Sequence, residues 1–153
     1  KLIDTGLKTM TGGRLKRLKK YLKNESFLLT YGDGISNVNI KKLINYHKKR
    51  KGIATLTAVR PPARFGAIKI KKENVEYFRE KSKLNVGWIN GGFFVFSPKI
   101  FNYIKKDSTF LEKEPMEILT KKKKLKAYKH YDFWQCIDTK RDRDMLEKKL
   151  RKI

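Results

Sequence analysis

The stretch Phe27–Tyr31 (FLLTY), followed by Gly32–Gly34 (GDG), decides the fold of this chain. The first five residues form an apolar run of strand length, and the glycines end it in a turn. After the predicted helix cap Asn39, apolar residues recur at the i, i+3, i+4, i+7 spacing of one helix face, namely Ile40, Leu43, Ile44 and His47. The β-branched run Ile53–Val59 predicts a second strand. This order is typical of an α/β fold with a mostly parallel sheet.

The rest of the chain continues the alternation with shorter elements. A helix is predicted after the breaker pair Gly12-Gly13, two short ones after Pro98 and at Pro115, and an amphipathic one over residues 141–152. Further strands are predicted at 65–70, 75–78, 88–96, 125–131 and 133–137. Because no repeat or linker interrupts the sequence, we expect one domain covering residues 1–153.

Charge is the most unusual feature of the composition. The 153 residues include 39 Lys+Arg and 15 Asp+Glu, a formal net charge of +24, which first suggests a polyanionic partner. Hydrophobic residues make up 39% and aromatic residues 12%, too much for a disordered polycation. The lysine runs end predicted helices or strands, where a solvated surface is expected. Zinc-ligand spacing and nucleic-acid-binding motifs are absent from the sequence, so nucleic-acid binding is the weaker alternative.

Location and partners follow from what the sequence lacks. The longest apolar run, Trp88–Phe96, is too short to span a bilayer, and no export signal opens the chain. The single cysteine, Cys136, excludes an internal disulfide and reads as a buried core thiol. We therefore expect a cytoplasmic protein with neither a membrane nor a nucleic-acid partner.

Two aspartates follow predicted strands and are candidate metal ligands. Asp33 lies between two glycines, which let a phosphate approach closely, but Asp-Gly is also a common turn pair. Asp138 follows the run Phe133–Ile137 and is also suited to cap the next helix. Two carboxylates at strand ends can hold one Mg²⁺ together with substrate phosphates. Their spacing in sequence does not establish that they meet.

Other candidates carry weaker signals. The stretch Thr11–Arg14 precedes a helix, so its backbone amides could hold an anion, although loop glycines more often serve backbone geometry. Lys81 could contact a phosphate, but it is one of many lysines. Asn90-Gly91-Gly92 inside an apolar run indicates a bulge or a close ligand approach. The rigid loop Arg60–Gly66, with the guanidiniums of Arg60 and Arg64, is suited to a phosphate or a subunit contact. His47 and His130 lack a metal-ligand spacing and are assigned to structure.

Six motifs occur in one order along almost the whole chain. They are DTG at 4–6, MTGGRLKR at 10–17, TYGDG at 30–34, RPPARFGA at 60–67, WINGGFFV at 88–95 and FWQCIDT at 133–139. As a set they resemble the glucose-1-phosphate cytidylyltransferases, a branch of the sugar nucleotidyltransferase family. The resemblance implies a Rossmann-like nucleotide-diphospho-sugar transferase fold with a mixed, mostly parallel sheet. The implied reaction joins CTP and α-D-glucose 1-phosphate into CDP-glucose and pyrophosphate, which serves surface polysaccharide synthesis such as that of lipopolysaccharide O-antigen.

The resemblance also implies roles for single residues. Asp33 and Asp138 would bind Mg²⁺ and, with Lys81, act in catalysis. The nucleotide would lie at Thr11, Gly12, Gly13, Arg14 and Gly32, and the sugar phosphate at Gly66, Glu80, Lys81 and Asn90. Ser82 follows the Glu-Lys pair where relatives usually have proline, so the stiffness of that loop is in question.

One departure from the family is an absence. Relatives begin with a Gly-x-Gly-Thr-Arg loop and a downstream lysine that grip the triphosphate, and neither occurs here. We therefore expect an N-terminally truncated fold that is inactive alone. Alternatives are a relative that uses dTTP or UTP, a non-catalytic relative, or a basic nucleic-acid-binding protein. Family tendency leads us to expect a homo-oligomer.

Overall fold

The computed structural model describes residues 1–61, 67–79 and 87–151. Its contacts group into two compact units. Unit 1 comprises residues 1–30, 39–56 and 93–128, and unit 2 comprises residues 31–38, 57–92 and 129–153. The prediction of one domain over residues 1–153 stays a prediction.

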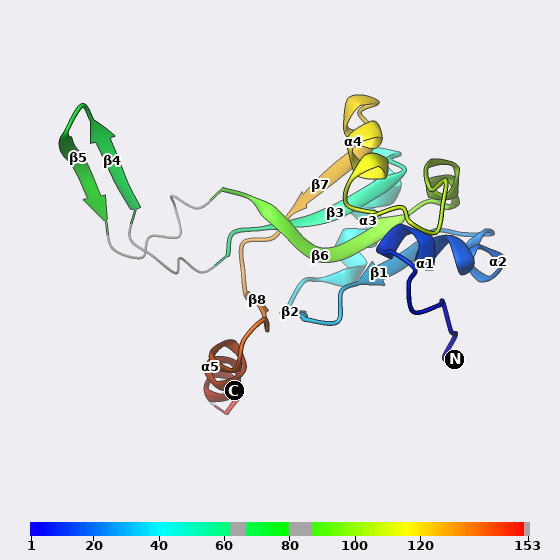
Figure 1. Cartoon of the computed structure of the whole chain (residues 1–153), viewed down its shortest axis with the longest axis horizontal. Coiled ribbons are helices and arrows are strands. Elements are labelled where there is room, and N and C mark those ends of the chain that lie inside the picture. Colours follow the sequence, from blue (N-terminus) through cyan, green and yellow to red (C-terminus); the bar gives the residue numbers. More distant parts are fainter. Residues whose placement is uncertain (62–66, 80–86, 152–153) are drawn as a thin grey trace. The chain divides into compact units, whose positions relative to one another are not determined.

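A four-stranded sheet with the order β1-β6-β3-β7 organises the fold (Figure 1). Its strands are β1 (Phe27–Thr30), β6 (Ile89–Phe96), β3 (Ala54–Val59) and β7 (Leu125–Lys129). β1 pairs antiparallel with β6. The backbone bonds from Ile53 to Lys124 and from His130 to Ala58 advance in the same direction, so β7 runs parallel to β3. The predicted mixed α/β sheet is confirmed, and the carboxyl ends of β1, β3 and β7 share one edge.

Two further ladders were only partly predicted. β4 (Ala67–Lys71) and β5 (Asn74–Arg79) correspond to the strands predicted at 65–70 and 75–78, and they pair antiparallel as a hairpin. β2 (Gly34–Ser36) pairs antiparallel with β8 (Trp134–Cys136). The sequence pattern did not predict β2, because a three-residue strand directly after a glycine turn is too short to show an alternation.

Six helices lie before, between and after the strands in the described part of the chain. They are α1 (Thr11–Arg17), α2 (Lys19–Leu22), α3 (Ile40–Arg50), the 3₁₀ helix η2 (Pro98–Tyr103), α4 (Glu114–Lys121) and α5 (Lys140–Leu150). The predicted cap is confirmed, since Asn39 Oδ1 accepts from the Lys42 amide at 2.9 Å. The start of α1 corrects a prediction: Gly12-Gly13 does not break the helix but lies inside its first turn. No helix in the described ranges is long and apolar enough to cross a bilayer.

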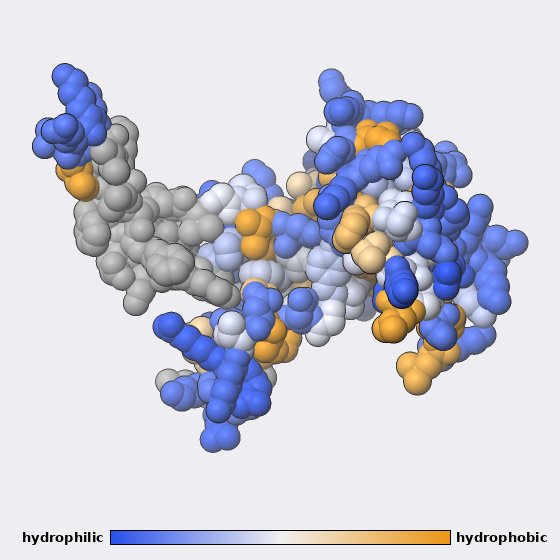
Figure 2. Space-filling view, in the orientation of Figure 1, coloured by the Kyte–Doolittle hydropathy of each residue, from blue (hydrophilic) through white to orange (hydrophobic). Residues whose placement is uncertain are grey.

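The core of unit 1 is built from aromatic and branched side chains. Phe27 lies 5.7 Å from Phe96 and 5.9 Å from Phe101, measured between ring centroids. Side chains with almost no exposed surface fill the space around them, namely Leu43, Phe94, Ile100, Leu111 and Leu119. Hydrophilic residues cover much of the face seen in Figure 2. The basic runs at 48–51 and 121–124 are exposed throughout, which supports a solvated role for that charge.

Two threonines of β3 have opposite hydrogen-bonding states. Thr55 and Thr57 are both fully buried, but only the Thr55 hydroxyl has a partner, the Nδ1 atom of His47 at 2.8 Å. We expect Thr57→Val to raise the free energy of unfolding by about 1 kcal/mol, since it removes an unsatisfied buried hydroxyl. The matched change Thr55→Val should lower it by about 1–3 kcal/mol. Urea unfolding measures both, and equal destabilisation by the two would contradict the assignment.

His47 makes stability depend on pH. Burial lowers the pKa of its imidazole below the ordinary 6.5. The unfolded chain therefore binds a proton at a pH where the folded chain does not, so the free energy of unfolding should fall as pH drops below about 6.5. Unfolding between about pH 7.5 and about pH 5.5 tests this. His47→Gln can still bond Thr55 and should show a weaker pH dependence; an unchanged slope would argue against His47.

Candidate functional site

The backbones of the two candidate metal ligands lie at one end of the β2–β8 ladder, inside unit 2. Gly34 pairs with Cys136, and the ladder extends by one bond, from the Ile137 amide to the Asp33 carbonyl at 2.9 Å. Asp33 therefore lies opposite Ile137 and next to the backbone of Asp138. The sequence could not predict this placement, because 104 residues separate the two aspartates along the chain.

Local structure decides between the alternative roles of these aspartates. The cap of α5 is Thr139, which forms a capping box with Asp142: the Thr139 hydroxyl accepts from the Asp142 amide at 3.2 Å, and an Asp142 carboxylate oxygen accepts from the Thr139 amide at 3.1 Å. Asp138 is therefore not the cap. Asp33 is exposed in the turn that opens β2, so the turn role and an accessible carboxylate coexist.

Cys136 corrects a prediction. It is half-buried rather than a core thiol, and its Sγ donates to Asp138 Oδ2 at 3.2 Å. The thiol lies beside this carboxylate because Cys136 is the last residue of β8 and Asp138 follows two residues later.

The two aspartates suit a hard cation whose remaining ligands are water and substrate phosphates. In the ranges that the structure describes, no three His, Cys, Asp or Glu side chains are placed to share a metal ion. A protein, however, usually contributes only one or two carboxylates to a Mg²⁺ site, and substrate phosphates supply further ligands. The residues present therefore fit Mg²⁺, which stays a proposal.

Asn90 and the two glycines after it shape the neighbouring strand of unit 2. Asn90 Oδ1 accepts from the Gly92 amide at 3.0 Å, and Gly92 has a φ of +78°. A Cβ on Gly92 would lie 2.9 Å from the Tyr31 ring, and a Cβ on Gly91 2.8 Å from Val59. The groups that come closest to Gly91 and Gly92 are therefore side chains of the protein itself, Val59 and Tyr31.

Trp134 and Tyr31 tie this strand to the aspartates. The Trp134 indole donates to the Gly91 carbonyl at 2.8 Å, and the Tyr31 amide donates to the Gly92 carbonyl at 3.0 Å. Trp134 and Tyr31 belong to the segments that carry Asp138 and Asp33. Both residues lie in motifs that carry the family resemblance, but the sequence pattern assigned them no role. Their hydrogen bonds to Gly91 and Gly92 depend on contacts between segments that are distant in sequence, so the sequence alone did not reveal them.

The stretch Thr11–Arg14 lies in unit 1, where protein groups already use its donors. The amides of Gly12 and Gly13 both donate to the Thr109 carbonyl, at 2.9 and 3.2 Å. This corrects the expectation that these amides hold an anion. Thr11 Oγ1 donates to Glu112 at 2.7 Å, and the Arg14 guanidinium donates to Thr5 Oγ1 at 2.9 Å. The nucleotide-binding role of the stretch stays a prediction that rests on the resemblance.

An ion pair holds the same region of unit 1. Arg17 Nη2 lies 2.6 Å from Asp107 Oδ2. The hydrogen bond between them raises the pKa of Arg17 and lowers the pKa of Asp107. Both charges stay ionised at neutral pH and hold α1 against the loop at 105–113.

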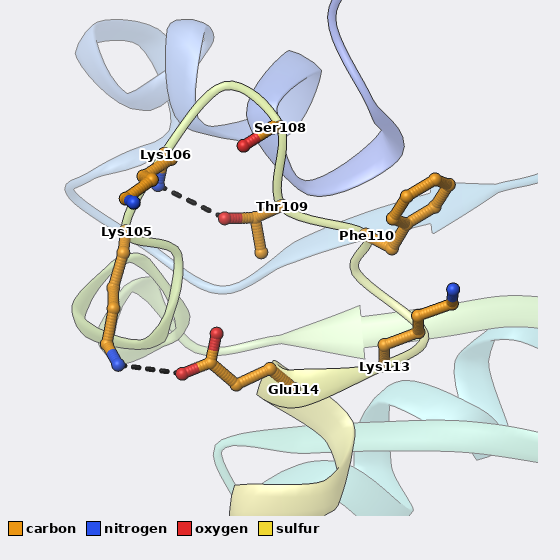
Figure 3. A pocket seen from close by; sticks show the side chains of 7 residues that line it. All are labelled: Lys105, Lys106, Ser108, Thr109, Phe110, Lys113 and Glu114. Atoms are coloured by element: carbon orange, nitrogen blue, oxygen red, sulfur yellow. Dashed lines mark hydrogen bonds and ion pairs between the residues drawn. The ribbon is translucent and has the colours of Figure 1, made fainter.

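That loop also borders a pocket of about 380 Å³ in unit 1 (Figure 3). Lys105 pairs with Glu114 at 2.7 Å across it, and the remaining lining residues are Lys106, Ser108, Thr109, Phe110 and Lys113. None of the predicted site residues lines this pocket. Three other predicted residues, Gly66, Glu80 and Lys81, lie outside the described residues. Gly32 is exposed, with open space where a Cβ would be.

Comparisons with known proteins find relatives over almost the whole chain. The chain is 48% identical over 147 residues to glucose-1-phosphate cytidylyltransferase of Salmonella typhimurium, an alignment covering 95% of this chain and 57% of that protein. It is 44% identical over 138 residues to a probable glucose-1-phosphate cytidylyltransferase of Bacillus subtilis, covering 90% of this chain and 54% of that one. The chain thus spans little more than half the length of these relatives.

Solved structures show the same fold. The crystal structure of HddC from Yersinia pseudotuberculosis complexed with GMP-PN matches 97% of this chain and 65% of that chain, with a TM-score of 0.69 and 22% identity. Residues 11–146 match the profile of the family described as "Nucleotidyl transferase". A mixed α/β sheet, two aspartates at one ladder end and a family match over most of the sequence agree: the chain belongs to the nucleotidyl transferase family.

Proposed function

We propose that this chain forms part of an enzyme that transfers a cytidylyl group from CTP to α-D-glucose 1-phosphate. The observation that supports the proposal is that the backbones of Asp33 and Asp138 lie at the same end of the β2–β8 ladder. The choice of CTP and glucose 1-phosphate is supported by the 48% identity to a glucose-1-phosphate cytidylyltransferase.

The reaction needs positioning and charge compensation rather than a covalent intermediate. An oxygen of the sugar phosphate forms a bond to the α-phosphorus of CTP. The bond from that phosphorus to the bridging oxygen breaks, and pyrophosphate leaves with the electron pair. Bound Mg²⁺ supplies charge compensation between two anionic substrates. Asp33 and Asp138 would hold the ion, and Asn90 would lie on the sugar side, held in place by its bond to the Gly92 amide.

Turnover by the complete reading frame that encodes this chain tests the proposal. Pyrophosphate release is measured with glucose 1-phosphate and, in separate reactions, CTP, dTTP or UTP. We expect release that needs both substrates and Mg²⁺ and is at least about tenfold faster with CTP. A preference for dTTP or UTP would contradict the assigned nucleotide. No release with any of the three would contradict the enzyme activity.

A further inference from the structure

Unit 2 contains a basic–aromatic cluster that the reaction scheme does not use. Its members are Arg60, Trp88, Lys129 and Tyr131. The Arg60 guanidinium carbon lies 4.9 Å and the Lys129 ammonium 5.6 Å from the centroid of a Trp88 ring. Tyr131 meets Trp88 edge to face, with ring centroids 5.2 Å apart. Two cations and two aromatic rings therefore converge on one place.

The cluster lies where the sheet ends. Arg60 directly follows β3, and Lys129 is the last residue of β7. The bond from the His130 amide to the Ala58 carbonyl, 2.9 Å long, holds these two strand ends side by side. Ligands of open α/β sheets bind beyond the carboxyl ends of the strands.

Strand alternation relates the cluster to the sugar side of the candidate site. Trp88 directly precedes β6 and is two residues from Asn90, so both side chains lie on one face of the extended chain. Asn90 is one of the residues that the family resemblance assigns to the sugar phosphate. A ligand held by Asn90 would thus extend along the same face toward Trp88.

Among the residues that the structure describes, neither cation of the cluster, Arg60 or Lys129, forms an ion pair with a carboxylate. In addition, the Nε atom of Arg60 is buried and has no hydrogen-bond acceptor. The negative face of the indole ring attracts both cations, but it leaves the buried Nε donor of Arg60 unsatisfied. A guanidinium with such an unsatisfied donor is well matched to a phosphate.

We propose that the basic–aromatic cluster is a phosphate subsite that binds the phosphate of the sugar phosphate and selects it over the neutral sugar. This inference rests on the proposed function and assigns residues to its sugar side. Arg60 donates to phosphate oxygens, Lys129 adds a second positive charge, and Trp88 holds the two cations within reach of one anion.

Calorimetric titration of the 153-residue chain with glucose 1-phosphate, and separately with glucose, tests the subsite. Arg60→Gln and Lys129→Gln should each raise the dissociation constant for glucose 1-phosphate by about tenfold, with little effect on glucose. Arg60→Lys keeps the charge but lacks the fork of donors, and should recover only part of the affinity. The dependence of affinity on salt should weaken in both glutamine variants.

Lys124→Gln is the matched control, because it removes one exposed lysine from unit 1. Thermal unfolding of every variant checks that the fold is kept. Unchanged glucose 1-phosphate binding in Arg60→Gln and Lys129→Gln would overturn the subsite, as would an equal loss in Lys124→Gln. Failure of the parent chain to bind glucose 1-phosphate would also overturn it. The turnover assay on the complete reading frame decides the proposed function separately.

Discussion

Asp33→Asn is expected to weaken binding of Mn²⁺, a probe for the Mg²⁺ site, by at least about tenfold. Asp33 and Asp138 are the two carboxylates that the β2–β8 ladder brings to one end. With only two protein carboxylates, the loss of one charge removes half of the countercharge that the chain offers. Asp138→Asn should therefore have a similar effect. Titration of the 153-residue chain with Mn²⁺, followed by electron paramagnetic resonance, measures both.

Asp144→Asn is the control for this prediction. Asp144 lies on α5, pairs with Arg143 at 3.1 Å and has a side chain that is 47% exposed, so its substitution removes the same charge from another element. Mn²⁺ binding should be unchanged in this variant. If the variants at residues 33 and 138 bind Mn²⁺ like the Asp144 variant, neither aspartate is a metal ligand.

Gly13→Ala is expected to destabilise the chain by about 3 kcal/mol or more. A Cβ at this position would overlap the backbone of Asp107, and backbone atoms cannot rotate away as a side chain would. The Asp107 carbonyl also accepts from the Met10 amide at 2.9 Å, so a shift of the loop would break that bond. Urea unfolding followed by circular dichroism measures the loss.

Gly32→Ala is the matched control, since nothing lies within 4 Å of its Cβ position. Its free energy of unfolding should stay within about 0.5 kcal/mol of the parent value. Loss of stability in Gly13→Ala but not in Gly32→Ala would show that Gly13 has a structural role in addition to any role in ligand binding. A Gly13→Ala chain as stable as the Gly32→Ala chain would contradict the close approach of the loop to α1.

Several elements were predictable because they depend on neighbours in sequence. The α3 pattern and its Asn39 cap are local, and so is the apolar run Trp88–Phe96 that predicted a strand. The β2–β8 ladder was not predictable, because three-residue strands have no periodicity and gain their stability only from each other. The role of Gly12-Gly13 was misread for a related reason: the group that requires glycine, the loop at Asp107–Thr109, is almost a hundred residues away.

The sequence by itself determined the α/β class, the family resemblance and the identity of the two candidate aspartates. These follow from side-chain chemistry and short-range patterns. Only the tertiary structure decided that Asp33 and Asp138 share one ladder end, that Thr139 rather than Asp138 caps α5, and that Arg60, Trp88 and Lys129 converge. Each of these depends on which distant strands pair, and pairing is set by the packing of the whole sheet rather than by any single segment.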